Sequence, residues 1–174
     1  MLVQLGARRG EQDLVDLLLE CHTRIRNFLA IARRLPQAGD LEERRTAASQ
    51  VHRYFTSAFP LHLEDEDVLA REVGCDNPSI SGALATMQAD HADHAAAIER
   101  LVHALAQIMR DPANRSLDAE LLAATERVDL LLEPHLLLEE REIFPVLRRL
   151  PEAMSTLLRA GMRKRREIVL QPRS

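Results

Sequence analysis

The chain has 174 residues, of which 46% are hydrophobic and 29% charged, so it is long enough for one domain with a real core and is not globally disordered. Aromatic residues make up only 3%, and Gly and Pro number 6 and 8, so the composition favours helix almost everywhere. A net charge of -4 argues against nucleic acid as a partner. No apolar run approaches the roughly 20 residues of a membrane span. We expect an all-α, cytoplasmic protein without membrane contact.

The first predicted elements are an irregular arm, residues 1–10, and two long helices. Residues 11–35 place apolar side chains three and four apart, with His22 beside this stripe. Asp40, followed three residues later by Glu43, has the pattern of a capping box and predicts the start of the second helix. That helix continues to residue 73 and contains Pro60, which should kink it because proline removes a backbone hydrogen bond.

The second half of the chain repeats this organisation. A third helix is expected after Pro78 and runs to about Arg110, and a fourth continues from about Ser116 through Phe144. Pro134 should kink the fourth helix as Pro60 kinks the second.

Short connections between long amphipathic helices favour an up-and-down antiparallel four-helix bundle with a short C-terminal fifth helix. We expect one domain over residues 11–150, followed by a helix and tail over residues 151–174. The fifth helix ends in a basic run at 163–166.

Two copies of one spacing point to metal chemistry. His62 precedes Glu66 by four residues, and His135 precedes Glu139 by four. Four helical residues return a side chain to nearly the same face one turn further along, so each imidazole and carboxylate can bind the same metal centre. A single such pair is weak evidence, but here it recurs.

The remaining candidate ligands follow the same repeat. His22 lies 40 residues before His62, and His91 lies 44 before His135, so the two halves resemble each other. A bundle with this pseudo-twofold order would bring the ligands to one level. Imidazoles with two carboxylates suit iron, manganese or zinc, and paired carboxylates can bridge two ions. The complete set of candidate metal ligands is His22, His62, Glu66, His91, His94, His135 and Glu139.

Helix lengths test whether these residues lie at one depth. Nineteen residues separate His91 from Arg110 at the end of the third helix, and nineteen separate Ser116 at the start of the fourth helix from His135. His91 and His135 should therefore lie at the same depth in the bundle, which favours His91 over His94 as the partner of His135. In the first half, His22 and His62 differ by nine residues, or roughly 14 Å along a helix. Either the first loop must rise along the bundle axis, or the second helix must begin beyond the end of the first. If neither holds, His52 is the alternative ligand.

Other polar residues have plainer interpretations. His103 is expected to be structural, and Tyr54 is either core packing or a hydrogen-bond donor to a metal ligand. Cys21 and Cys75 form no Cys-x-x-Cys pair and are expected to be free thiols, with Cys21 packing on its helix. We expect solvated faces for the acidic run 64–67 apart from Glu66, for Glu140 and Glu142, and for the basic run 163–166, which could alternatively contact an acidic partner.

The pattern of His, His-x-x-x-Glu, His and His-x-x-x-Glu on four successive helices resembles the hemerythrin-like family with its HHE cation-binding domain. The matching segments are His-Leu-Glu-Asp-Glu-Asp-Val-Leu from His62 and the stretch from His135 that ends Ile-Phe-Pro at Pro145. The resemblance implies two non-haem iron ions bridged by Glu66 and Glu139. It also implies that His22 and His62 bind one ion, and that His91 and His135 bind the other.

The chain departs from the classical oxygen carriers at two positions. They place a second His four residues after the first on the third helix, where this chain has Ala95, so His94 could take that role. Their last carboxylate is Asp at a spacing of five, not Glu at four.

We therefore expect a di-iron protein that binds dioxygen or a related small ligand for oxygen binding, storage or sensing. The alternatives are a di-iron enzyme acting on hydrogen peroxide or nitric oxide, an iron donor in iron-sulfur cluster repair, or an iron-responsive helical adaptor. Zinc or manganese could replace iron, and a protein partner of the chain is unknown.

Overall fold

A computed structural model describes residues 13–74 and 77–170, with side chains up to Glu167, so Gly6, Gly10 and Cys75 lie outside the described residues. The described residues are helical throughout, with short connections and no strand. The first half consists of α1 (Leu14–Arg34), the 3₁₀ turn η1 (Leu35–Gln37), α2 (Leu41–Arg53), the π-helical turn η2 (Tyr54–Ala58) and α3 (Phe59–Gly74).

The second half repeats the plan. It consists of the 3₁₀ turn η3 (Pro78–Ile80), α4 (Ser81–Arg110), the 3₁₀ turn η4 (Arg115–Leu117), α5 (Asp118–Leu138), the π-helical turn η5 (Glu139–Ile143) and α6 (Phe144–Leu147). The fifth helix, α7 (Glu152–Leu170), follows after a short connection. An all-α chain with four long helical segments and a shorter C-terminal helix is thus confirmed.

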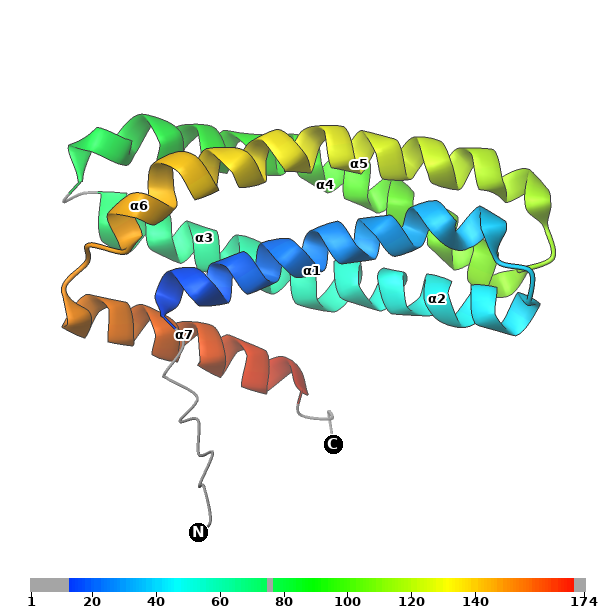
Figure 1. Ribbon diagram of the computed structural model, residues 1–174, viewed down its shortest axis with the longest axis horizontal. Helices are drawn as coiled ribbons and strands as arrows, with labels where there is room; N and C mark the ends of the chain where they lie inside the picture. The colour runs from blue at the N-terminus through cyan, green and yellow to red at the C-terminus, as the bar shows by residue number, and fades with distance from the viewer. Residues whose placement is uncertain (1–12, 75–76, 171–174) are drawn as a thin grey trace, which may run out of the picture.

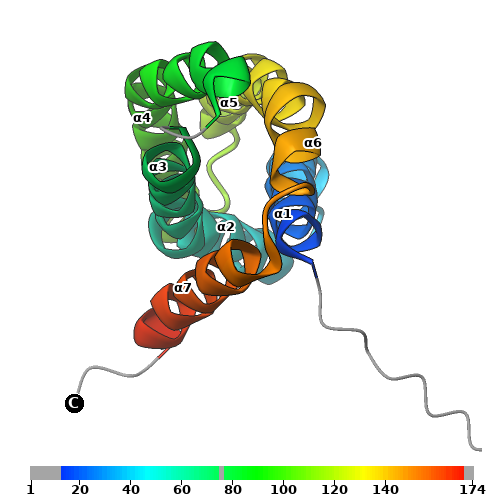
Figure 2. The ribbon, with the colours of Figure 1, turned by 90° about the vertical axis from the view of Figure 1, so that its left-hand side faces the viewer.

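The four long segments surround a common interior, as the view along the bundle shows (Figure 2). α1 packs against α2 and α5, and α4 packs against α5, α2 and α3. α7 lies outside this ring, against α1 and α3 (Figures 1 and 2). Within the described residues, no helix combines the length and the hydropathy that crossing a bilayer requires.

Local chemistry explains where the second segment begins. The Asp40 side chain accepts a hydrogen bond of 2.7 Å from the backbone N–H of Glu43, which satisfies one of the free donors at the start of α2. The predicted helix start at Asp40 is confirmed.

The two π-helical turns lie near prolines. α5 continues through Pro134 without interruption, and the departure from α-helical geometry comes five residues later, in η5. Both π turns immediately precede a Phe-Pro pair, at Pro60 and at Pro145. A proline lacks the N–H donor and crowds the carbonyl four residues earlier. A turn closed by i→i+5 bonds relieves that conflict, and such turns occur frequently at functional sites.

The core is divided into two apolar clusters. One fills the end of the bundle near the η1 and η4 loops and includes Ile25, Val51, Leu101, Leu105 and Leu132. The other fills the opposite end; it includes Leu14, Leu18, Met87, Phe144 and Leu158. Six buried polar side chains belong to neither cluster and form a layer between them: His22, His62, Glu66, His94, His135 and Glu139. Apolar packing on both sides keeps water from this layer.

Candidate metal site

The seven candidate ligands come from five elements and meet in the polar layer. They are His22 on α1, His62 and Glu66 on α3, His91 and His94 on α4, His135 on α5 and Glu139 at the start of η5. All except His91 are almost completely buried, and the His91 side chain is 16% exposed. Four of them, His22, His62, Glu66 and Glu139, each offer one ligand atom, and these atoms lie within 4.8 Å of one another.

Glu66 contacts histidines from both halves of the chain. Its Oε1 lies 2.6 Å from Nε2 of His62, while its Oε2 lies 2.8 Å from Nε2 of His91. Oε2 is also 3.7 Å from Nε2 of His135. The two oxygens of one carboxylate thus face two different sets of imidazole nitrogens.

Glu139 has the same relation to the other histidines. Its Oε2 lies 3.0 Å from Nε2 of His22, and its Oε1 lies 3.0 Å from Nε2 of His135. Each carboxylate therefore spans the interior from the α1–α3 side to the α4–α5 side. This is the arrangement in which a carboxylate can contact two neighbouring metal ions.

Several of these close contacts lack hydrogen-bond geometry. His62 Nε2, Glu66 Oε1, His135 Nε2 and Glu139 Oε1 are buried polar atoms without a hydrogen-bond partner. Buried polar atoms in folded proteins are normally satisfied, so a set of four that converge needs an explanation. Nitrogen and oxygen lone pairs aimed at a common point are what metal ions require, so these residues fit a metal centre.

The outer nitrogens of three histidines have acidic partners. His22 Nδ1 donates to Glu140 Oε1 at 2.8 Å, and the same oxygen accepts 2.8 Å from Arg26 Nη1. His135 Nδ1 lies 3.3 Å from Asp90, and His91 Nδ1 lies 3.7 Å from Asp67. A carboxylate on the outer nitrogen fixes the ring and leaves the inner nitrogen for a metal.

The role of Glu140 corrects the prediction of a solvated face. Its side chain is 23% exposed and joins His22 to Arg26, which in turn holds Glu133 through two hydrogen bonds of 2.9 and 3.1 Å. Neighbouring positions on an α-helix are about 100° apart. The wider η5 turn begins at Glu139, so that Glu139 and Glu140 both reach the His22 ring.

The prediction of solvated charges is also wrong for Asp65, Arg165 and Arg166, because the Asp65 carboxylate pairs with both arginines, whereas Arg163 and Lys164 are exposed as predicted. Asp65, beside Glu66, is 1% exposed and is held by two arginines of α7. Arg165 Nε donates to Asp65 Oδ1 at 2.6 Å, and Arg166 Nη2 lies 2.7 Å from Oδ2. The basic run is therefore in part an anchor that fastens α7 to the helix carrying His62 and Glu66.

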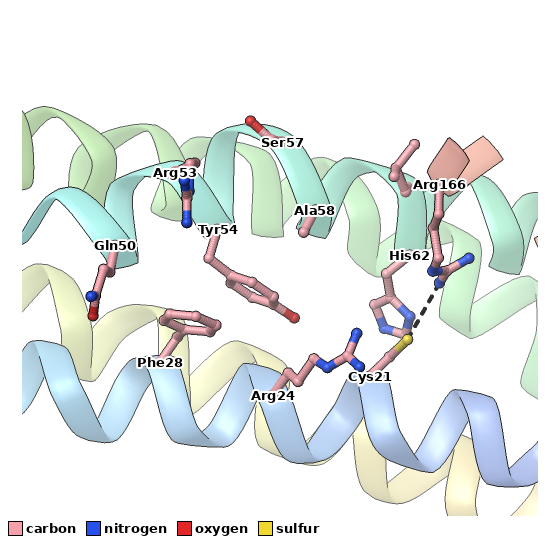
Figure 3. Close-up of a pocket in the computed structure, with 11 residues that line it drawn as sticks. Cys21, Arg24, Phe28, Gln50, Arg53, Tyr54, Ser57, Ala58, His62 and Arg166 are labelled. Atoms are coloured by element: carbon pink, nitrogen blue, oxygen red, sulfur yellow. Dashed lines mark hydrogen bonds between the residues drawn. The ribbon is translucent and has the colours of Figure 1, made fainter. Parts of the chain in front are cut away.

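Cys21 lies at the edge of this site instead of only packing along its helix. The buried thiol accepts a hydrogen bond of 3.4 Å from Arg166 and lies next to the His62 ring (Figure 3). Burial raises the pKa of a thiol, but the contact with His62 and the positive charge of Arg166 outweigh that effect and lower the pKa of Cys21.

The ionisation of the metal-free site follows from its paired charges. Burial lowers the pKa of His135, but the Glu139 and Glu66 carboxylates, 3.0 and 3.7 Å from its Nε2, overcome this and raise it to about 10. The pKa of His62 is raised in the same way, against burial, by Glu66, while that of Glu66 is lowered well below its usual value by His62 and its other imidazole neighbours. Without metal, the protonated His62 and His135 are therefore paired with the ionised Glu66 carboxylate.

α4 supplies two of its three histidines, His91 and His94, to the layer. His91 reaches Glu66, whereas His94 is 1% exposed and places its ring edge-on to His135, with centroids 4.6 Å apart. Asp90, His94 and His135 also form a possible three-ligand group. Burial and the charge of His135 lower the pKa of His94, which favours the neutral form that binds metals. The structure therefore brings both histidines to the layer.

The remaining histidines lie elsewhere. His52 on α2 and His103 on α4 belong to none of the candidate ligand groups, and His103 instead bonds Gln107 at 2.9 Å. Tyr54 stacks on Phe28, with ring centroids 4.2 Å apart, in the apolar cluster beside the layer.

His22 and His62 do meet at one level, because their ring centroids lie 5.4 Å apart. The η1 turn extends α1 by about 6 Å, since a 3₁₀ turn rises about 2 Å per residue. This length is less than half of the roughly 14 Å by which the two helices were expected to differ.

Comparison with known proteins assigns the family. The model of the hemerythrin HHE cation-binding domain matches residues 13–147, which include all seven candidate ligands. None of the curated proteins compared with the chain matches it. Because the family model covers well over half of the chain, the chain belongs to the hemerythrin HHE cation-binding domain family.

Proposed function

We propose that the protein holds two non-haem iron ions, bridged by Glu66 and Glu139, and that this centre binds dioxygen or a related small ligand. One observation carries the proposal: each of these buried carboxylates directs its two oxygens to histidines from opposite halves of the chain. A single ion would need only one of these sets.

The distances support one division of the ligands between two ions. His22 and His62, with Glu66 Oε1 and Glu139 Oε2, would hold one ion. His135, with the other two carboxylate oxygens and His91 or His94, would hold the second. Manganese or zinc would also suit nitrogen and oxygen ligands, so the choice of iron comes from the family.

The side chains around the site support small-molecule chemistry. An iron pair of this kind supplies binding or reduction of a small oxygen or nitrogen species. Two carboxylates neutralise only part of the charge of two metal ions, so the site favours a small anionic or reduced ligand. The apolar clusters on either side exclude bulk water, while Glu140 and Asp90 fix the imidazole rings.

The proposal includes an antiparallel, up-and-down order of the four long segments, which short connections between neighbouring segments favour. It also includes one domain over residues 11–150 and a cytoplasmic location.

The test is a metal count together with an optical spectrum of the iron-loaded protein under air and under argon. We expect two irons per chain and an absorption band that forms in air and bleaches on degassing. Consumption of peroxide or nitric oxide without such a band would replace ligand binding by an enzymatic role. Loss of a bound protein on chelation, without either behaviour, would favour an adaptor.

A matched pair of variants tests the site itself. His62→Ala should lose iron, whereas His103→Ala should keep it, because His103 lies outside the ligand groups. Two irons in the first variant, or iron loss in the second, would contradict the assignment.

A further inference from the structure

A separate cavity of about 670 Å³ lies beside the metal layer, between α1, the α2–α3 segment and Arg166 of α7 (Figure 3). This volume is within the range of about 300–1,000 Å³ that small organic ligands occupy. Its inner end is formed by Cys21 and His62. The proposed oxygen species would fill only a small fraction of it.

The lining of the cavity is basic. Arg24, Arg53 and Arg166 contribute to it, and none of the lining residues is acidic. Arg24 is paired with Glu20 on the same helix. Arg53, in contrast, has no carboxylate partner within the part of the chain that the structure describes.

The third arginine also leaves a positive charge at the cavity. Arg166 shares the Asp65 carboxylate with Arg165, so two guanidinium groups are balanced by one carboxylate. The unbalanced charge of the Arg165–Arg166 pair and the charge of Arg53 together make the cavity positively charged. Guanidinium groups pair with carboxylates and phosphates in bidentate geometry, so an anionic oxygen group is the favoured guest.

Part of the lining is apolar and flat. Phe28 and Tyr54 stack with ring centroids 4.2 Å apart and an interplanar angle of 17°, and Leu61 also lines the cavity. Figure 3 shows the Tyr54 hydroxyl, the Arg24 guanidinium and the His62 ring directed toward the same space. An apolar wall with a few convergent polar groups is the usual composition of a site for an organic ligand.

We propose that this cavity binds an organic anion, with its carboxylate or phosphate on the arginines and its apolar body against Phe28 and Tyr54. The site requires no metal and goes beyond the proposed binding of a small oxygen species. An anion bound there lies next to His62, one of the candidate metal ligands, and so changes the charge beside the metal centre without binding the metal.

The chain contains its own probe for this cavity. Tyr54 is the single tyrosine and tryptophan is absent, so tyrosine fluorescence reports on the cavity wall alone. We would titrate 4-phenylbutyrate, phenyl phosphate and the neutral 4-phenylbutanol into the protein as purified and after chelation. Saturable fluorescence changes with at least one anion, in both preparations, are expected, and the tighter anion identifies the head group.

Variants locate the binding. Arg53→Gln should weaken the anion by about tenfold, the size expected for a lost hydrogen bond to a charged group, and Arg24→Gln should weaken it as well. Arg71→Gln, an exposed arginine of α3 outside the cavity, should bind like the parent.

Three results would overturn the proposal. They are equal affinity for the neutral alcohol, unchanged affinity in both cavity variants, or binding that disappears on chelation and therefore belongs to the metal. If the protein proves not to hold two irons, the titration of the chelated protein still tests anion binding. The organic-anion site and the di-iron centre can therefore be refuted independently.

Discussion

The two sides of the metal layer are built differently. On the α1–α3 side, His22 and His62 are almost completely buried, although His62 lines the neighbouring cavity, and His22 is held from both ring nitrogens by Glu139 and Glu140. On the α4–α5 side, the His91 side chain is 16% exposed, and its outer partner Asp67 is 50% exposed. The histidines of the first side are therefore more deeply buried than His91 on the second.

The second side also has a third histidine. His91 and His94 both reach the layer, although only one imidazole besides His135 is needed to mirror the first side. Buried, hydrogen-bonded ligands hold a metal tightly, while an open position is where small ligands bind. We infer that the ion on the α1–α3 side is the firmly held one and that ligand exchange takes place on the other.

The residues common to both sides should have the largest effect. Glu139→Ala removes an oxygen from each of the two proposed ions, so we expect the variant to lose both. Glu142→Ala, an exposed position in the same turn, is the control and should retain them. Metal analysis after gel filtration measures the difference, and a Glu139→Ala protein with its full metal content would show that the carboxylate is not shared.

Removal of single histidines should separate the two sides. His22→Ala should empty the site on the α1–α3 side, because His22 is its only ligand from α1. His91→Ala or His94→Ala alone should lose less metal, since the other histidine lies nearby, and only the double variant should empty the second site. Equal losses in all three single variants would remove the asymmetry.

The carboxylates that bond the outer histidine nitrogens should have smaller effects, and the one beside His22 should matter more than the one beside His91. Glu140→Gln should weaken metal binding by about 10- to 100-fold, the range for partners of ligating histidines. Asp67→Asn should matter less, because Asp67 is half exposed and 3.7 Å from His91. Competition with a chelator of known affinity gives both values, and a larger effect of Asp67→Asn would reverse the proposed order.

The pH dependence of the metal-free protein should be the smallest effect. His135 has a pKa of about 10 when folded against 6.5 as the reference, so its stabilising contribution is complete below about 6.5 and lost as the pH rises through 10. Glu66, with a lowered pKa, contributes above about 4.5 and loses that contribution as the pH falls.

Thermal unfolding of the chelated protein should therefore show a lower midpoint at pH 10 than at pH 7. The metal-loaded protein should lose less, because bound metal keeps the histidines deprotonated. A chelated protein as stable at pH 10 as at pH 7 would contradict the paired charges described for the layer.

The sequence predicted the helical segments and the ligand candidates because both depend on local periodicity. His62 with Glu66 and His135 with Glu139 share a helix face whatever the tertiary structure is. The order of the chain also sufficed to select His22 and His91 as their counterparts.

What the sequence did not predict are contacts between distant segments. Asp65 and Arg166 look like solvated charges until α7 packs on α3, and Glu140 looks exposed until the η5 turn widens beside α1. A charge in a helix carries no local sign of a partner a hundred residues away. One signal was available for Glu140: it is acidic and lies next to a His-x-x-x-Glu motif, and ligating histidines commonly bond to carboxylates.

Anomalous diffraction at the iron edge from crystals of the iron-loaded protein tests the di-iron centre most directly. We expect two peaks about 3.5–4 Å apart, the usual spacing of paired ions. One peak should lie beside His22 and His62, the other beside His135, and both should contact Glu66 and Glu139. A single peak, or two peaks that share neither carboxylate, would contradict the di-iron centre.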